Sequence, residues 1–106
     1  MLIGCATYLE ARMMDDLTGF QRDLLTVIAG LEGPNGLEIK SEMEDYYEST
    51  INHGRLYPNL DTLVERDLVE KTKQDERTNA YHVTDDGLAL LEERREWESQ
   101  YVQPTA

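Results

Sequence analysis

A change of hydrophobic period between residues 52 and 83 limits the fold of this chain more than any other feature. Apolar residues recur at helical spacing from Leu56 to Leu63. From Leu68 to Lys73 apolar and polar residues alternate instead, as in a half-exposed strand, and Thr78 to Val83 reads as a return strand. The polar residues 74–77 between the two runs predict a turn. The pattern therefore predicts a helix followed directly by a β-hairpin.

Helical patterns also precede this region, and polar residues mark where they begin. The four residues from Thr18 have the form of a capping box, which predicts a helix that continues to the turn cluster at residues 32–36. A shorter, acidic helix is expected from about Leu37 to Glu48. Asn52 is a favoured N-cap for the helix expected at residues 53–67.

Two short helices joined by a tight connector, the second with a polar outer face, form a helix-turn-helix, and the hairpin after them is a wing. The predicted fold class is therefore mainly α with a small β-hairpin. It is a winged helix-turn-helix with added N- and C-terminal helices that form a dimer. We place a helical arm at residues 1–15, the winged helix-turn-helix domain at residues 16–84, and a C-terminal helix at residues 85–106.

Both terminal helices carry apolar stripes beyond what one small core needs. The arm has its stripe over residues 2–13. Thr84 is the expected N-cap of a last helix that reaches about Tyr101. Large exposed apolar stripes usually mark an interface, so we expect a two-fold dimer. The alternative is that both helices fold back onto their own core. The expected interface residues are Leu2, Ala6, Leu9, Met13, Leu90, Trp97 and Tyr101.

The composition argues against several other classes of protein. The length of 106 residues suits one domain with an added arm. No apolar run approaches the roughly 20 residues of a membrane span, and the apolar start lacks a cationic leader, so a cytoplasmic protein is expected. The single cysteine, Cys5, allows no disulfide within the chain. Because Cys5, His53 and His82 lack metal-ligand spacing and no catalytic pattern is visible, we expect no metal, no cofactor and no enzymatic activity.

The charge is strongly acidic and unevenly distributed. Asp and Glu number 22 against 10 Lys and Arg, which gives a net charge of −12. This balance suits a protein that works at high salt, where repulsion between carboxylates is screened, although an ordinary acidic protein can have it too. Five of the ten bases lie in residues 53–82. If the chain binds an anion, we expect this segment to do so; the alternative is that its bases pair with neighbouring acids.

The helix and strand around residues 56–69 resemble a known family, the PadR-type winged-helix transcription regulators. Their recognition helix and first wing strand are similar to Leu56-Tyr57-Pro58-Asn59-Leu60 followed by Leu63 to Val69. The family's Arg, Tyr, Thr and Gly at the wing and the next helix are matched by Arg77, Tyr81, Thr84 and Gly87. The resemblance covers about residues 18–92, and the acidic composition is similar to that of a haloarchaeal member. Asp67 departs from the pattern, since the family has a glycine before the wing strand.

The resemblance implies a sequence-specific transcriptional regulator that binds double-stranded DNA as a homodimer. Arg55 can bond two acceptors of a guanine edge, and Asn52 and Asn59 can bond phosphate or adenine. Wing residues can reach the DNA backbone or the minor groove. The expected DNA-binding residues are Asn52, His53, Arg55, Tyr57, Asn59, Thr62, Lys71, Lys73, Arg77 and Asn79.

Several of these residues have structural alternatives. His53 either adds a phosphate contact with some pH sensitivity or is an exposed helix residue. Tyr57 either bonds a phosphate through its hydroxyl or packs on the second helix, the one expected from Thr18. The alternative for the wing bases is ion pairing, of Arg77 with Asp75 and of Lys71 with Glu70 or Asp67.

The net charge conflicts with DNA binding, because an acidic chain repels a polyanion. Our hypothesis is that bound cations lie between the acidic residues and the phosphates, so that binding weakens less with salt than is usual. The alternative function is a winged-helix protein-interaction module without DNA binding. The acidic surface favours that alternative, whereas the bases at residues 55–77 favour the regulator.

Overall fold

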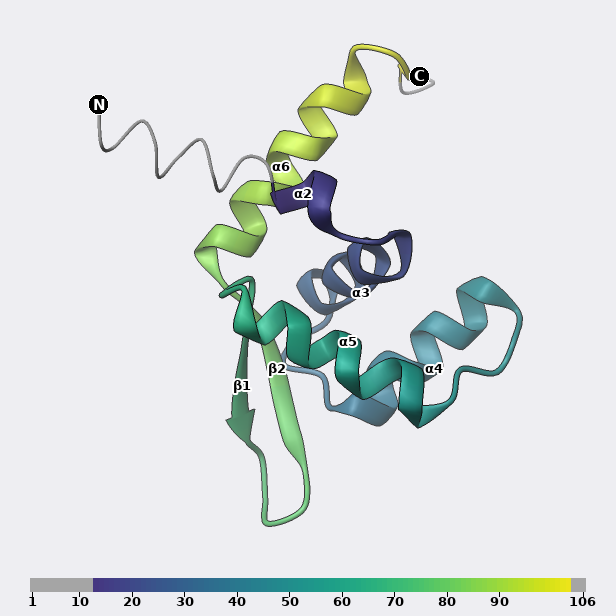
Figure 1. Ribbon diagram of the computed structural model, residues 1–106, viewed down its shortest axis with the longest axis vertical. Helices are drawn as coiled ribbons and strands as arrows, with labels where there is room; N and C mark the ends of the chain where they lie inside the picture. Colours follow the sequence, from purple (N-terminus) through teal and green to yellow (C-terminus); the bar gives the residue numbers. More distant parts are fainter. Residues whose placement is uncertain (1–12, 104–106) are drawn as a thin grey trace.

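Helices α3, α4 and α5 pack beside a two-stranded hairpin in the computed structural model, which describes residues 13–103 (Figure 1). The elements in chain order are α2 (Met13–Asp16), α3 (Gly19–Gly30), α4 (Gly36–Tyr47), α5 (His53–Glu65), β1 (Val69–Lys73), β2 (Asn79–Val83) and α6 (Asp85–Ser99). This order confirms a mainly helical winged helix-turn-helix. The predicted arm residues Leu2, Ala6 and Leu9 lie outside the described residues.

Polar caps start the helices where the sequence predicts them. The Thr18 hydroxyl accepts a hydrogen bond from the Gln21 backbone at 3.1 Å, and the Gln21 side chain accepts one from the Thr18 backbone at 3.1 Å. Asn52 Oδ1 accepts the Arg55 N–H at 2.8 Å, and Thr84 caps α6 in the same way. Each cap satisfies a backbone N–H that has no partner within its helix, so the three predicted caps are confirmed.

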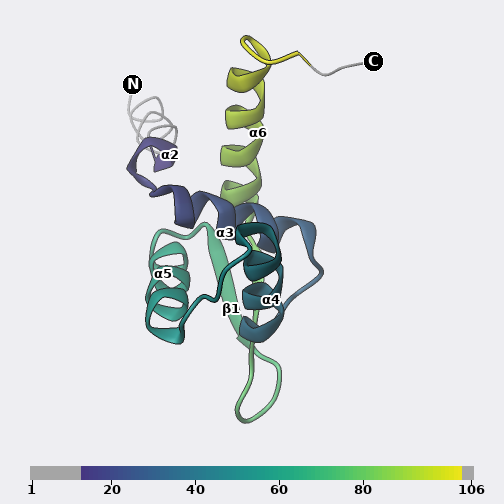
Figure 2. The same cartoon turned by 90° about the vertical axis from the view of Figure 1, so that its right-hand side faces the viewer.

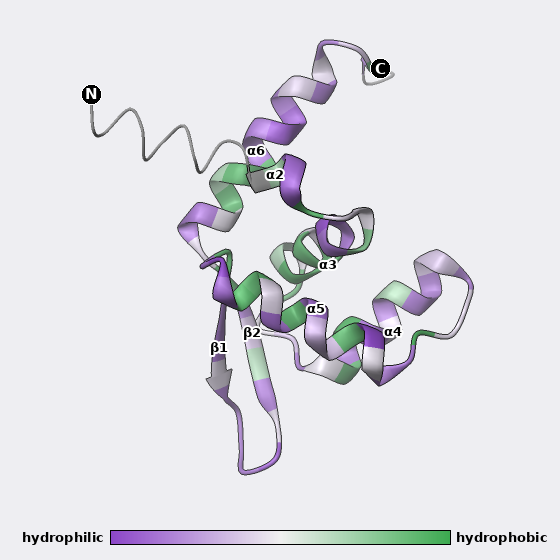
Figure 3. Ribbon diagram, viewed as in Figure 1, coloured by the Kyte–Doolittle hydropathy of each residue, from purple (hydrophilic) through white to green (hydrophobic). Residues whose placement is uncertain are grey.

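The inner faces of α3, α4 and α5 meet in one apolar core. On α5, Leu56, Leu60 and Leu63 are fully buried, as their helical spacing predicts. Figure 3 shows hydrophobic stretches along α3 and α5 and near the start of α6. The core consists of Met14, Leu17, Phe20, Leu24, Leu25, Ile28, Ile39, Met43, Ile51, Leu56, Leu60, Leu63, Leu68, Val69, Tyr81 and Leu90.

The wing is an antiparallel pair in which Val69 lies opposite Val83 and Lys73 opposite Asn79. The predicted alternation along β1 is wrong, because only Val69 is buried and the four residues after it are exposed. The hairpin extends away from the helices (Figure 1), so most of β1 has no core to cover either face. Tyr81 on β2 remains buried, and its backbone N–H donates to the Pro34 carbonyl at 2.9 Å.

The helix α5 ends earlier than the sequence predicts, in a Schellman motif. The Leu68 N–H donates to the Leu63 carbonyl at 3.1 Å, and the Asp67 N–H donates to the Val64 carbonyl at 3.0 Å. Asp67 has a φ of 61°, in the left-handed region that glycine adopts most easily. The departure from the PadR pattern is therefore a position where the backbone needs a left-handed residue, and aspartate is one of the few side chains that tolerates it.

A three-way joint connects the end of α5, the base of the wing and the start of α6. The Thr84 hydroxyl donates to the Asp67 carbonyl at 2.7 Å and accepts the Gly87 N–H at 3.0 Å. The Thr84 N–H donates to the Leu68 carbonyl at 3.0 Å. A Cβ on Gly87 would collide with that same Leu68 carbonyl oxygen. Only glycine at position 87 lets α6 approach the wing base this closely.

Beyond the joint, α6 projects from the domain (Figure 2). Trp97 is 48% exposed and Tyr101 is 69% exposed, as the sequence predicts for a single chain. The assignment of Leu90 to the same exposed stripe is wrong, because Leu90 is only 4% exposed and belongs to the chain's own core. The first turns of α6 pack on the domain, so a residue near its start is buried there while those two turns later are not.

We predict that Gly87→Ala lowers the free energy of unfolding by about 2 kcal/mol or more, because the added methyl overlaps main-chain atoms that cannot move aside. Chemical denaturation followed by circular dichroism measures this change. Gly30→Ala is the matched control, since nothing lies within 4 Å of its Cβ position. The joint is less constrained than described if both alanine variants have the wild-type stability.

Candidate nucleic-acid interface

The hairpin and the starts of α4 and α5 lie on the side of the molecule away from the free end of α6 (Figure 1). A groove of about 340 Å³ lies between these elements. Four of the residues predicted to bind DNA line it: His53 and Tyr57 from α5, and Arg77 and Asn79 from the wing. The fold thus brings the first turns of the expected recognition helix and the wing tip to one surface, although β1 separates them in the sequence.

Tyr57 supports the position of α5 in this groove. Its side chain is half-buried, and its hydroxyl lies against Gly36, where any Cβ would overlap it. The structure therefore has Tyr57 packed on α4, whereas the structural alternative named the helix that begins at Thr18. His53 is exposed beside it, with ring centroids 5.5 Å apart.

The wing bases are exposed and only weakly engaged with acids. Lys71 Nζ lies 3.5 Å from Asp61 Oδ1, a partner on α5 that the sequence analysis did not identify. Asp75 accepts the backbone N–H of Arg77 at 2.9 Å. Among residues 13–103 no carboxylate lies within ion-pair distance of the Arg77 guanidinium, so this side chain is available to a ligand. Surface pairs such as that of Lys71 contribute little stability, roughly 0–1 kcal/mol.

Asn59 has both of its polar atoms bonded inside the protein. Its Oδ1 accepts from Gln21 Nε2 at 2.8 Å, and its Nδ2 donates to the Arg55 carbonyl at 2.7 Å. Gln21, which is 9% exposed, therefore caps α3 and also holds α5. Sequence reasoning found the capping role of Gln21 but missed its bond to α5, because the partner lies 38 positions away.

Two other predicted residues make bonds within α5 and still face solvent. Asn52 is exposed, and its Oδ1 caps the helix, which leaves its amide N–H groups available. Thr62 Oγ1 donates to the Pro58 carbonyl at 3.1 Å on the outer face. Neither bond removes the side chain from the surface that a ligand would meet.

The Arg55 side chain, which we expected to reach a guanine edge, lies instead against two aromatic rings. Its guanidinium carbon lies 4.0 Å from the centroid of the Phe20 ring on α3 and 5.9 Å from the centroid of the Tyr47 ring on α4. A guanidinium over an aromatic face is a favourable cation–π contact. Sequence spacing gave no signal for these two rings, because the contact joins three different helices.

The Tyr47 ring is held in place by its hydroxyl, which donates to Asp23 Oδ2 at 2.6 Å. Burial, followed by the hydrogen bond to the Asp23 carboxylate, raises the pKa of Tyr47 to about 12. Tyr47 is therefore a neutral donor at any physiological pH. The hydrogen bond links the end of α4 to α3 beside the Arg55 guanidinium.

Glu44 fixes the connector that precedes α5. One carboxylate oxygen accepts hydrogen bonds from Lys40 Nζ and from the Ile51 N–H, both at 2.8 Å. The hydrogen bond from Lys40, with that from the Ile51 backbone, lowers the pKa of Glu44 below its ordinary value. The turn of the helix-turn-helix is thus held by one charged side chain.

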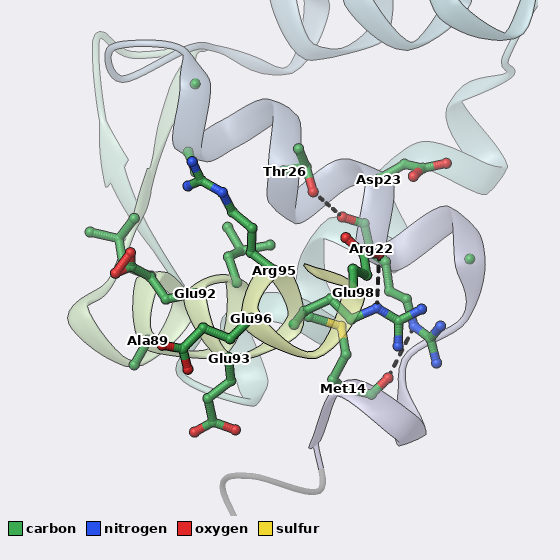
Figure 4. A pocket seen from close by; sticks show the side chains of 16 residues that line it. Met14, Arg22, Asp23, Thr26, Ala89, Glu92, Glu93, Arg95, Glu96 and Glu98 are labelled. Carbon is green, nitrogen blue, oxygen red and sulfur yellow. Dashed lines mark hydrogen bonds and ion pairs between the residues drawn. The ribbon is translucent and has the colours of Figure 1, made fainter. Parts of the chain in front are cut away.

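A second, larger groove of about 1100 Å³ separates α3 from α6 (Figure 4). Its apolar lining includes Ala29, Leu88 and Leu91, and its rim carries the charged side chains of Arg22 and Glu98, among others. The groove lies on the side of the domain from which α6 projects, and it contains none of the predicted DNA-binding residues.

Within residues 13–103 no group of three or more His, Cys, Asp or Glu side chains is placed to hold a metal ion. In that same part of the chain, no helix is both long and apolar enough to cross a membrane. Cys5 lies outside the described residues.

The capped recognition helix, the wing and the groove that joins them define a winged helix-turn-helix protein. Residues 24–93 match the Transcriptional regulator PadR-like family. The chain belongs to this family. A search of curated protein sequences finds no match.

Solved structures similar to this chain include several of RosR. RosR from H. salinarum, grown from NaBr, is 48% identical with a TM-score of 0.74, over 85% of this chain and 82% of that one. The complex structure of hsRosR-S4 is 47% identical with a TM-score of 0.81, over 92% and 81%. A PadR-like transcriptional regulator from Bacillus cereus strain ATCC 14579 is 26% identical with a TM-score of 0.63, over 74% and 81%.

We predict that Glu44→Gln removes part of the acid sensitivity of the fold. Because the pKa of Glu44 is lower in the folded than in the unfolded chain, its carboxylate stabilises the fold above the ordinary value of 4.5. That contribution disappears as the pH falls through the lowered pKa. Unfolding free energies measured between neutral and acidic pH test this, with the exposed Glu42→Gln as control. An equal pH dependence in wild type and Glu44→Gln would contradict the role of Glu44.

Proposed function

We propose that this PadR-like regulator binds double-stranded DNA sequence-specifically, as a homodimer, through α5 and the wing. The groove between them carries the proposal, because it places His53 beside Arg77 and Asn79. In a winged helix-turn-helix the recognition helix enters the major groove with its N-terminal residues. A phosphate chain that passes along this groove would meet the wing and the start of α5 together.

The bonds inside the protein divide the expected contact residues into two groups. Tyr57 packs on α4 and Asn59 is bonded to α3, so we assign both to supporting α5. The remaining residues have exposed or half-exposed side chains and are the proposed DNA contacts: Asn52, His53, Arg55, Thr62, Lys71, Lys73, Arg77 and Asn79.

Cations are part of the proposed complex. Asp61 and Glu65 are exposed on α5, and Asp75 and Glu76 directly precede Arg77 at the wing tip, so carboxylates would approach the phosphates. Cations held between these acids and the DNA offset the repulsion, and they are abundant at high salt. The likeness to RosR from H. salinarum agrees with this adaptation. Binding would then weaken less steeply with salt than it does for a basic protein.

The proposed homodimer uses the terminal helices. The exposed Trp97 and Tyr101 rings lie 5.3 Å apart near the end of α6, and Arg94 lies over the Trp97 ring. Together with the groove between α3 and α6, they form an apolar surface that a second copy can cover. Residues 85–106 and the arm at 1–15 are the proposed dimerisation segments, and residues 16–84 the DNA-binding domain.

We predict that Arg77→Ala weakens DNA binding by about fivefold to twentyfold, because it removes one charge-assisted phosphate contact per subunit. Fluorescence anisotropy measures the affinity for a duplex that the wild type selects from a random pool. Arg66→Ala removes the same charge at the end of α5, outside this groove and outside the proposed dimerisation segments, and serves as the control. If the two variants bind equally well, the wing does not contact DNA.

We predict that Trp97→Ser raises the dimer dissociation constant by about thirtyfold or more, the effect of losing one aromatic hot spot. Sedimentation equilibrium measures this constant. Tyr46→Ser is the matched control, because Tyr46 is an aromatic residue 75% exposed on α4, outside the proposed interface. A dimer that survives Trp97→Ser unchanged would place the interface elsewhere.

A further inference from the structure

The position of Arg55 has a consequence for how the proposed DNA contact is made, and the argument rests on the proposed function. The Arg55 guanidinium lies over the face of the Phe20 ring, 4.0 Å from its centroid. The Phe20 and Tyr47 rings meet edge to face, with centroids 5.9 Å apart and an interplanar angle of 73°. We call these two rings, from α3 and α4, the aromatic cradle.

The aromatic cradle is a fixed part of the fold. Phe20 is 7% exposed and belongs to the core, one residue after the start of α3. Tyr47 packs against the core and is bonded to Asp23 at 2.6 Å. Arg55 is the exposed partner, so its side chain rests on rings that cannot follow it away from the domain.

Helix geometry places Arg55 at one edge of α5. At about 100° per residue, Arg55 and Asn59 share one flank, and His53 and Tyr57 share the other. The bond from Gln21 to Asn59 shows that the first flank faces α3. The second flank faces the groove with Arg77. The outward face between the two flanks carries other residues, among them Gly54, Pro58 and Thr62.

A helix that lies in the major groove points its outward face at the base edges and its flanks at the two phosphate chains. A guanidinium stacked by its face keeps its N–H groups free in the plane, where they can bond a phosphate. To reach a guanine, the fork would have to leave the rings and turn to the outward face.

We propose that Phe20 and Tyr47 hold Arg55 as an anchor for the DNA backbone rather than as a reader of a base. Arg55 binds a phosphate on the α3 side of the recognition helix, and His53 and Arg77 bind the chain on the other side. Phe20 and Tyr47 are positioning residues for this contact. Base discrimination belongs to the outward face of α5.

The test compares wild type and Arg55→Ala on a duplex selected by the wild type and on its complete set of single-base-pair variants, at several salt concentrations. Arg55→Ala is expected to weaken binding to every duplex by the same factor, within about twofold. The slope of log affinity against log salt should become less negative by about 2 for a dimer, since one phosphate contact is lost per subunit.

The cradle is tested by a double-mutant cycle. Phe20→Leu is expected to weaken binding about twofold to fivefold when Arg55 is present, and to have no effect in the Arg55→Ala background. Phe20→Tyr keeps the ring and should keep the affinity. A general loss of structure would instead lower affinity equally in both backgrounds. Thermal unfolding of each variant confirms that the binding assays use folded protein.

Three results would overturn the anchor. Arg55→Ala that loses discrimination at one base pair, with little change elsewhere, would make Arg55 a base reader. Arg55→Ala that leaves affinity and salt slope unchanged would remove Arg55 from the contact. If the wild type selects no sequence but Arg55→Ala weakens its binding to every duplex equally, the proposed sequence specificity is wrong and the phosphate contact of Arg55 is supported. Absence of all DNA binding by the wild type would overturn both the proposed function and the Arg55 anchor.

Discussion

The hydroxyl of Thr84 is the point on which the arrangement of the functional surfaces depends. It connects the carbonyl of Asp67 with the first turn of α6, and the Thr84 backbone bonds Leu68 at the base of the wing. The helix α5 ends at this joint, and the wing and α6 begin there. These bonds therefore fix the orientation of α5, the wing and α6 relative to one another. Gly87 and the left-handed Asp67 are the two residues that make the close approach sterically allowed.

The recognition helix is supported on each side by a different kind of contact. Glu44 holds the connector before it, Tyr57 fits over Gly36 on one flank, and Gln21 bonds Asn59 on the other. None of these contacts involves the outward face of α5. The division explains why Tyr57 and Asn59 are structural although the helix is exposed over much of its surface.

The caps at Thr18, Asn52 and Thr84 and the hairpin were predictable, because capping and the polar turn between the two strands are local properties of the chain. The burial of Leu90 was not, since a stripe on a helix does not say where along its length the helix leaves the core. The position of Arg55 and the pairing of Lys71 with Asp61 were likewise out of reach. Both depend on side chains from separate elements, whose approach is decided by tertiary packing.

One measurement tests both the proposed DNA contact and the effect of the acidic charge on it. Selection from a random duplex pool by the folded wild-type protein, repeated from low salt to molar KCl, tests whether this chain reads DNA. The account predicts saturable, sequence-selective enrichment that persists at molar salt, because cations screen the carboxylates beside the wing. A folded dimer that enriches no sequence at any salt would contradict it, and would point to a winged helix that binds another protein.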